Sequence, residues 1–295
     1  MKAQRRWKGA ALCACAAGII FLPAATSPAD LVGETKLNPE TVAAFEQYVR
    51  TRDAQIEENT RKGFFLYTET LSDTLRMSME ADLRQGKISI LEVTTISPNQ
   101  PIRIPHGLIH DWVGIAFIPG ATAEQVNAVL LDFNRQQIIY NPDIRKSKLI
   151  ENKGNEYRVS QQFYTKSILT VVENGDFDVE YIPISDARSE IKSHSTRFAE
   201  VANAGKPNEQ ELPPEKQHGY VWRMNTHWKI EERDGGTYIQ VESIGLTRGV
   251  PALFAIIVNP LLRSIPKKYL ADSLNGTRKA VVEGQGARTV GGHTQ

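Results

Sequence analysis

The chain of 295 residues has few side chains in the combinations that enzymes use for catalysis. His106 and His110 have the i, i+4 spacing with which two imidazoles on one helical turn can bind a metal ion. We expect a strand here, however, and a rise of about 3.3 Å per residue places the two rings about 13 Å apart. The sequence has no Gly-x-Ser-x-Gly motif and no phosphate-binding glycine loop. We therefore expect no metal site and no cofactor, and we assign no catalytic residue.

Two polar residues could act inside a pocket. Arg197 has the same strand parity as Ile191 and Ser193, so its guanidinium either faces a cavity or forms an ion pair at a strand edge. In a cavity it could pair with a ligand head group or an oxyanion. Tyr140 either supplies a pocket hydroxyl or caps the turn before Pro142. Both interpretations stay open for each residue.

The composition is typical of a soluble globular protein. Hydrophobic residues make up 41% and charged residues 23% of the chain, which excludes a disordered, collagen-like or polytopic membrane protein. The 35 basic and 34 acidic residues nearly cancel, so the basic excess of a nucleic-acid-binding protein is missing. We therefore expect no nucleic-acid partner. A chain of this length can bury a core with room for a ligand.

Residues 1–29 have the pattern of a secretory signal peptide. Four basic residues precede the apolar run Ala10–Leu22, and Ser27 and Ala29 form a small-x-small cleavage site before Asp30. The run of about 13 residues is too short to span a bilayer, and a retained N-terminal anchor is the alternative. We therefore predict an exported protein, periplasmic or extracellular.

Both cysteines, Cys13 and Cys15, lie inside this predicted signal peptide. The processed chain would then have no disulfide and no thiol chemistry. Processing also removes four basic residues and no acidic one, which leaves 31 basic and 34 acidic residues and a net charge of −3. We therefore expect a cysteine-free, mildly acidic mature protein.

Residues 30–104 are predicted to form a helical N-terminal extension. Asn38 and Pro39 favour a helix start, and apolar residues follow at helical spacing. A second helix is indicated after Gly63 by apolar residues in steps of four before Gly86. A short strand at 88–93 and prolines at 98, 101 and 105 then mark a boundary.

Residues 105–284 change to a strand-like pattern and form the second predicted unit. A strand at 110–117 precedes a helix capped by Thr122 and a short helix at 138–140. Turns at 152–155, 174–175 and 234–236 then separate the strands of an antiparallel meander. A helix follows Pro266, and residues 285–295 are predicted to be a flexible tail.

The apolar stretch Leu253–Leu262 precedes this C-terminal helix and is broken at Pro260. It is too short to span a bilayer, yet apolar enough to act as a lid that touches a membrane during ligand loading. Ordinary packing of a kinked helix start is the alternative. The predicted membrane contact is therefore a transient one.

The last hairpin separates an apolar face from a polar one. Along residues 220–230 the even positions are mostly apolar and the odd positions polar. A turn at 234–235 places Trp228 opposite Val241, whereas a turn at 235–236 slides the pairing by two residues. Either register puts Glu242 on the polar outer face, where we expect it to pair with His227 or Lys229.

Five stretches carry a family resemblance: residues 118–122, 132–144, 228–237, 241–248 and 265–278. In their order they resemble the START-like, polyketide-cyclase-like (SRPBCC) superfamily over about Leu108–Glu283. The likeness is greatest to exported bacterial members with a helical N-terminal extension. It implies an α+β helix-grip fold, in which a curved antiparallel sheet of seven to eight strands surrounds a long C-terminal helix. A polar insertion at 202–217 departs from the compact family pattern.

The resemblance implies a cavity for an apolar ligand, such as a lipid, quinone or polyketide-like molecule, between the sheet and the C-terminal helix. A cavity suits such ligands because burying each methylene group contributes about 0.8 kcal/mol. A solid core filled by the same side chains is the alternative. The candidate ligand-binding residues are Tyr140, Tyr157, Phe163, Arg197, Trp222, Met224, Trp228, Val241, Leu270 and Leu274.

Three classes of function stay open. The leading hypothesis is an exported carrier of an apolar small molecule or lipid, because an export signal occurs together with an implied cavity. An enzyme of the cyclase or aromatase type is the second, since one fold can host several functions. An interaction scaffold with a solid core is the third.

Overall fold

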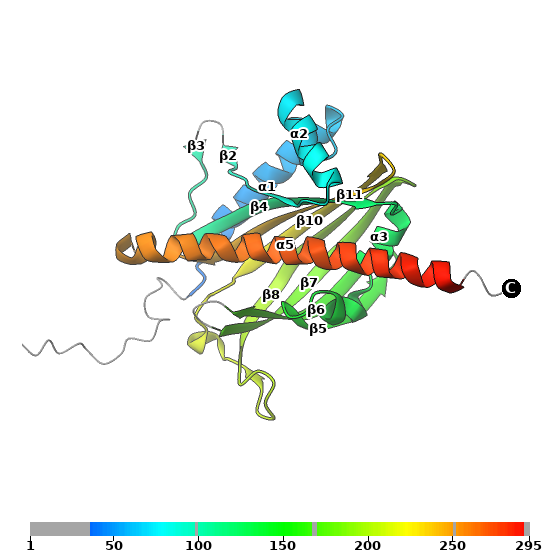
Figure 1. The fold of residues 1–295 in the computed structure, drawn as a ribbon. Helices are drawn as coiled ribbons and strands as arrows, with labels where there is room; N and C mark the ends of the chain where they lie inside the picture. The colour runs from blue at the N-terminus through cyan, green and yellow to red at the C-terminus, as the bar shows by residue number, and fades with distance from the viewer. Residues whose placement is uncertain (1–35, 98–99, 167–169, 250–251, 292–295) are drawn as a thin grey trace, which may run out of the picture.

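The computed structural model describes residues 36–97, 100–166, 170–249 and 252–291 (Figure 1). The predicted signal peptide lies outside these residues. The N-terminal part consists of helix α1 (Pro39–Arg61), the 3₁₀ helix η2 (Tyr67–Thr70), helix α2 (Asp73–Arg84) and strand β1 (Ser89–Glu92). The two predicted helices and the predicted strand of this part are therefore present.

Nine strands of the described chain form one curved, antiparallel sheet, in the order β1-β4-β11-β10-β8-β7-β6-β5, with β9 beside β8 (Figure 1). A two-stranded sheet of β2 (Ile96–Ser97) and β3 (Gln100–Pro101) is separate from it. The long strands are β4 (Gly107–Pro119), β5 (Ile144–Lys153), β6 (Glu156–Lys166), β7 (Thr170–Ser185), β8 (Arg188–Ala202), β10 (Arg223–Arg233) and β11 (Gly236–Arg248); β9 is Gln210–Glu211. Because β1 pairs with β4, the N-terminal extension supplies one strand of the sheet.

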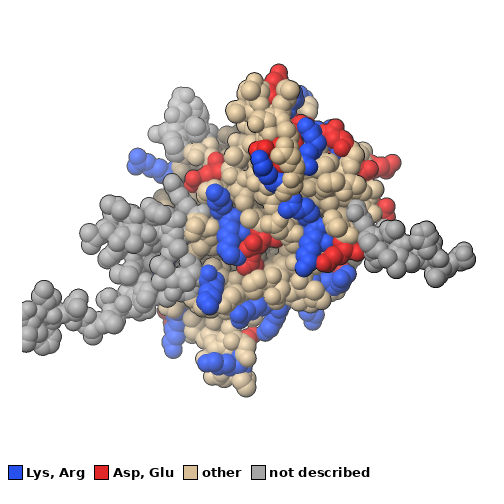
Figure 2. Space-filling view, in the orientation of Figure 1, with Lys and Arg blue, Asp and Glu red and all other residues tan. Residues whose placement is uncertain are grey.

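Helix α5 (Ala252–Gly291) runs across one face of the sheet (Figure 1). Its buried residues Leu270, Leu274 and Val281 join the core cluster on this inner face. Gly114 on β4 permits the close approach, because a Cβ atom there would lie 2.8 Å from Leu274 Cδ1. Lys and Arg side chains spread over the side of α5 that faces solvent (Figure 2). The α+β helix-grip fold predicted from the sequence is thereby confirmed.

Helix α5 is longer than the sequence pattern predicted. It passes through Pro260 and Pro266 without a break and ends at Gly291, inside the segment predicted to be a tail. A proline removes one backbone hydrogen bond and bends a helix, but packing of the remaining turns can keep the helix continuous. The predicted membrane contact at residues 253–262 lies outside the side chains that the structure describes. In the described part of the chain, no helix is long and apolar enough to cross a bilayer.

Two short helices close one end of the inner face: α3 (Ala123–Leu130) and α4 (Gln136–Ile139), joined by the 3₁₀ turn η3 (Phe133–Arg135). The predicted cap of α3 is present. Thr122 Oγ1 accepts a hydrogen bond from Gln125 N at 3.2 Å, and Gln125 Oε1 accepts one from Thr122 N at 3.1 Å. This reciprocal capping box fixes where α3 begins.

The predicted turn at Asn174-Gly175 is wrong. Both residues lie in the middle of β7, which continues to Ser185. A Cβ atom on Gly175 would lie 2.8 Å from the Phe177 ring and 3.0 Å from the Phe163 ring. Gly175 therefore leaves room for the aromatic rings on the inner face. The Asn174-Gly175 pair does not form a turn in this protein.

The turn at Asp234-Gly235 is confirmed. Both residues have positive φ angles, 57° and 76°, as the two-residue turn of a tight hairpin requires. The resulting register pairs Trp228 with Val241 and Ile230 with Ile239. The first of the two predicted registers is thus the observed one.

Helix α1 covers the outer face of the sheet, opposite α5. Its residues Phe45 and Tyr48 form a buried cluster with Trp222, Ile244 and Leu246. A second outer cluster joins Phe65, Leu66 and Leu83 of the extension to apolar residues of β4 and β11. The extension is therefore packed against the sheet over much of its length.

A buried pair of carboxyl groups, Glu173 on β7 and Glu200 on β8, holds the loop before β10. Glu200 accepts hydrogen bonds from His218 N at 2.6 Å and Gly219 N at 2.8 Å, and Glu173 accepts one from Val221 N at 3.0 Å. Burial, with the charge of Glu200 added, raises the pKa of Glu173 from 4.5 to about 8. This carboxyl group is therefore protonated in the folded protein at neutral pH.

Glu173→Gln is expected to stabilise the protein increasingly as the pH rises from about 4.5 to about 8. The folded-state pKa lies above the unfolded-state value, so the stability that Glu173 contributes is complete below pH 4.5 and is lost on the way to pH 8. Glutamine has no proton to lose. Urea unfolding between pH 4 and 9 measures the difference, with the exposed Glu156→Gln as the control. Parallel stability profiles of wild type and Glu173→Gln would contradict the buried, protonated state.

Candidate functional site

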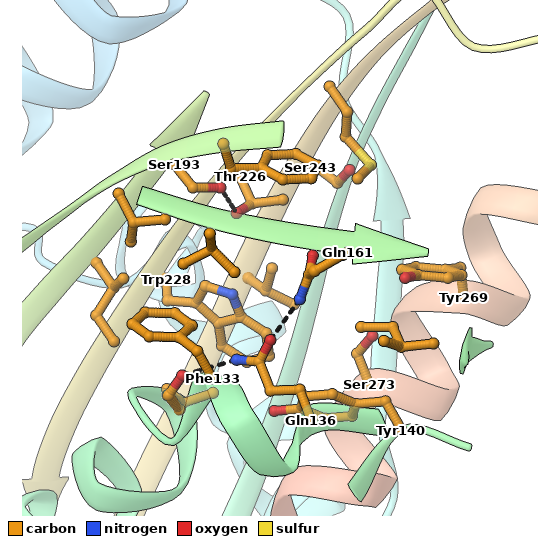
Figure 3. A pocket seen from close by; sticks show the side chains of 18 of the residues that line it. Phe133, Gln136, Tyr140, Gln161, Ser193, Thr226, Trp228, Ser243, Tyr269 and Ser273 are labelled. Atoms are coloured by element: carbon orange, nitrogen blue, oxygen red, sulfur yellow. Dashed lines mark hydrogen bonds between the residues drawn. The ribbon is translucent and has the colours of Figure 1, made fainter. Parts of the chain in front are cut away.

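A pocket of about 110 Å³ lies between the inner face of the sheet and α5 (Figure 3). Strands β6, β7, β8, β10 and β11 form one wall. Tyr269, Leu270 and Ser273 of α5 form the opposite wall, and the turn around α4 closes one end with Gln136 and Tyr140. The pocket is therefore bounded by the sheet and helix that define the fold.

Apolar side chains make up most of the sheet wall. Trp228 on β10 lies between its register partners, Ile191 on β8 and Val241 on β11, and all three line the pocket. Phe163 and Phe177 extend this wall, with their ring centroids 5.8 Å apart. Strand alternation places these residues together, because every second residue of a strand faces the same side.

A row of hydroxyl groups crosses the same wall. Thr226 on β10 has Ser193 on β8 and Ser243 on β11 as its register partners, and all three line the pocket (Figure 3). The Ser193 and Thr226 hydroxyls are hydrogen-bonded at 2.8 Å. The wall is thus apolar with a narrow polar strip.

Two amides and two phenols complete the polar lining. Gln161 Nε2 donates to Gln136 Oε1, and Gln136 Nε2 donates to the Leu130 carbonyl oxygen at 3.0 Å. The Tyr140 hydroxyl is hydrogen-bonded to Thr277 Oγ1 at 3.0 Å. Burial raises the pKa of Tyr140 to about 12 and raises that of Tyr269 well above its usual value. Both phenols are therefore neutral.

Six of the ten predicted site residues line this pocket, and four do not. The six are Tyr140, Phe163, Met224, Trp228, Val241 and Leu270. Tyr157 packs behind the lining residue Phe133, with ring centroids 5.2 Å apart. Leu274 packs against β4 at Gly114. Both residues support the wall without lining it.

The prediction that Arg197 faces a cavity is wrong, because β8 has a bulge. Arg197 pairs with Asp176, but Phe177 pairs with Ser195, so one residue of β8 is unpaired and the faces are inverted beyond it. Phe198 consequently takes the inner side. Arg197 forms the alternative ion pair, with Nε 2.8 Å from Asp176 Oδ2 and Nη1 2.7 Å from Glu211 Oε2.

Trp222 also lies on the outer face, in contrast to the prediction. Strand β10 begins only at Arg223, so the alternation that orients Met224 does not extend back to Trp222. Trp222 follows the loop that Glu173 and Glu200 hold, and its side chain packs against α1 in the outer cluster. Parity holds only within a continuous strand.

Sequence reasoning missed several residues that line the pocket. Ser243 has the strand parity of Val241, and Gln161 that of Phe163, so extending the parity argument to polar residues would have found both. Tyr269 and Ser273 are four residues apart on α5 and share its inner side. The role of Gln136 depends on the turn around α4, for which the sequence has no periodic signal.

Two further predictions concern charged groups outside the pocket. Glu242 does lie on the outer face, but it pairs with Arg52 of α1, whereas His227 and Lys229 pair with Glu190. His106 and His110 are engaged separately, with Glu40 and Thr247. Within the described ranges, no three His, Cys, Asp or Glu residues gather as a metal site would require.

No protein-family model matches the chain, and no curated protein matches it. Solved structures similar to it include the STAR-related lipid transfer protein of Xanthomonas axonopodis, at 14% identity over 64% of this chain and 98% of that one, with a TM-score of 0.42. Human STARD10 is 14% identical over 72% of this chain and 80% of its own, with a TM-score of 0.43. The Zhui aromatase/cyclase of Streptomyces is 12% identical over 59% and 94%, with a TM-score of 0.42. Each is a likeness in fold.

Proposed function

We propose that the protein is an exported carrier that binds an apolar small molecule between the sheet and α5. The observation that carries the proposal is the pocket of about 110 Å³, whose walls come from both elements and whose lining is mainly apolar. Apolar pockets with a few placed polar groups are typical of small-molecule sites. Export is proposed from the pattern of residues 1–29.

Binding in such a pocket is favoured by the removal of apolar surface from water. Each buried methylene group contributes about 0.8 kcal/mol, so shape and few polar contacts suffice for useful affinity. The hydroxyl strip formed by Ser193, Thr226 and Ser243 would orient a polar group of the ligand on the sheet wall. A carrier needs no further chemistry at this site.

Native mass spectrometry of the protein purified from its cell envelope tests both parts of the proposal. We expect a protein mass that corresponds to a chain beginning at Asp30, together with an additional mass from an intact apolar molecule. A full-length chain in the cytoplasm would contradict export. A ligand-free protein that converts a polyketone with loss of water would contradict the carrier and favour a cyclase.

We also propose a transient membrane contact of residues 253–262 during ligand loading, because this stretch is apolar and short. Ile257→Asp is expected to slow ligand transfer to liposomes several-fold without lowering the melting temperature, since a charge at a membrane interface opposes insertion. Transfer of a fluorescent ligand between liposomes measures the rate. Unchanged transfer with unchanged stability would contradict the contact.

A further inference from the structure

The polar groups of the pocket define a narrower ligand class than the fold does. Every polar side chain in the lining is a hydroxyl, a phenol or an amide, with Trp228 adding an indole N–H group. Most of them have partners inside the protein: Ser193 with Thr226, Tyr140 with Thr277, and Gln136 with Gln161. These partnered groups shape the wall and leave few positions for a ligand's polar atom.

Four lining groups have no hydrogen-bond partner in the described part of the chain. They are the Ser243 hydroxyl on β11, the Tyr269 and Ser273 hydroxyls on α5 and the indole N–H of Trp228 on β10. Figure 3 shows the Tyr269 hydroxyl directed away from α5, toward the pocket. All four side chains are partly exposed and line the pocket, so the polar atom of a ligand can bind to them in place of water. An indole N–H can only donate, so a ligand atom bound to it must be an acceptor.

The surroundings of the pocket disfavour a charged ligand. Burial raises the pKa values of Tyr140 and Tyr269, one at the end of the pocket and one on the helix wall, which means that negative charge is unfavourable at both places. The lining side chains are hydroxyl, amide and apolar groups, which hydrogen-bond neutral oxygens. A carboxylate or phosphate would lose its hydration without gaining a counter-charge from the lining residues that the structure describes.

The volume limits the size of the ligand. The pocket measures about 110 Å³. An engineered protein cavity of about 150 Å³ holds a benzene molecule, so the space here suits one ring and excludes a phospholipid in this conformation. The aromatic side chains of Phe163, Phe177 and Trp228 on the sheet wall offer ring faces and edges to such a molecule.

We propose that the pocket takes a neutral single-ring molecule with a hydroxyl or carbonyl oxygen, a phenol or quinone, whose oxygen is bound by the hydroxyls of Ser243 and Tyr269. This inference rests on the proposed binding function and specifies its ligand. The ring lies against the sheet wall, and its oxygen lies between β11 and α5.

A matched set of three probes tests the proposal by calorimetry on the full mature chain at pH 7. p-Cresol has a ring and a neutral hydroxyl, toluene lacks the oxygen, and 4-methylbenzoate carries a charge. We expect p-cresol to bind about tenfold more tightly than toluene. Its oxygen accepts or donates two or more hydrogen bonds, and each of them raises the affinity a few-fold. We expect no saturable binding of 4-methylbenzoate at the concentrations at which p-cresol saturates the protein.

Two variants identify the residues that bind the oxygen. Ser243→Ala and Tyr269→Phe should each lower the affinity for p-cresol about fivefold and change the affinity for toluene by less than about twofold. Each variant removes one hydrogen bond and keeps the shape of the pocket. The matched controls outside the pocket are Ser185→Ala at an exposed position and Tyr164→Phe, whose ring centroid lies 3.5 Å from the guanidinium carbon of Arg145. Thermal melts confirm that each variant is folded.

Other outcomes separate this inference from the carrier itself. Equal binding of 4-methylbenzoate and p-cresol, or an unchanged p-cresol affinity in both variants, would overturn the neutral-oxygen site. Binding of oleate or a dioleoyl phospholipid with no binding of p-cresol would overturn the inference and leave the carrier intact. Failure of every probe, the lipids included, would overturn both.

Discussion

Trp228→Ala is expected to lower the free energy of unfolding by about 3 kcal/mol and to shift the preferred ligand to a larger one. The indole lies between Ile191 and Val241 on the sheet wall, and its removal leaves a cavity that the neighbouring strands cannot close. Because Trp228 also lines the pocket, the new space joins the existing volume of about 110 Å³. The change therefore affects stability and ligand size together.

Urea unfolding and the binding of para-alkylphenols of graded chain length measure the two effects. Trp222→Ala is the matched control, since this tryptophan is buried against α1 on the opposite face. It should lose comparable stability without any change in the preferred chain length. A stability loss in Trp228→Ala with no change in ligand preference would assign Trp228 to the core and remove it from the binding site.

Period-two alternation predicted the part of the site where strands are regular. Both turns considered for the β10–β11 hairpin keep the same residues on the same face, so Met224, Trp228 and Val241 could be placed on one face from the sequence before the register was known. Both errors of orientation arose where the strand is irregular or ends. The bulge in β8 inverts Arg197, and Trp222 precedes the first residue of β10.

Other features depend on contacts between distant parts of the chain, which periodicity does not report. Gly175 is a glycine because a Cβ atom there would clash with the rings of Phe163 and Phe177. The local Asn-Gly turn rule therefore predicted the wrong structure. The partner of Glu242 is Arg52, which is 190 residues away in sequence. Local patterns thus define faces and caps, whereas bulges and ion-pair partners follow from the assembled sheet.

Arg52→Ala is expected to lower the free energy of unfolding by about 3 to 5 kcal/mol. Arg52 on α1 binds Glu242 through two bonds, Nε to Oε1 at 2.6 Å and Nη2 to Oε2 at 3.0 Å, and the two side chains are only 8% and 3% exposed. Without the guanidinium, Glu242 would be a buried carboxylate without its partner. It would lie near Asp111, whose pKa is raised well above its usual value by burial and by the charge of Glu242.

Urea unfolding at pH 7.5 measures the loss. The double variant Arg52→Met/Glu242→Leu should recover most of the stability, since replacing both members of a buried pair with apolar groups leaves no charge behind. Recovery would show that the single-variant loss comes from the stranded carboxylate.

The exposed pair Arg61 and Glu58 is the control on the same helix. Its atoms are 2.8 Å apart, but the side chains are 73% and 44% exposed, so Arg61→Ala should change stability by less than about 1 kcal/mol. A similar small change in Arg52→Ala would mean that the apolar clusters alone hold α1 on the sheet. A large loss in Arg52→Ala, with the control unaffected, would show that the buried Arg52–Glu242 pair is one of the polar links that hold the N-terminal extension on the sheet.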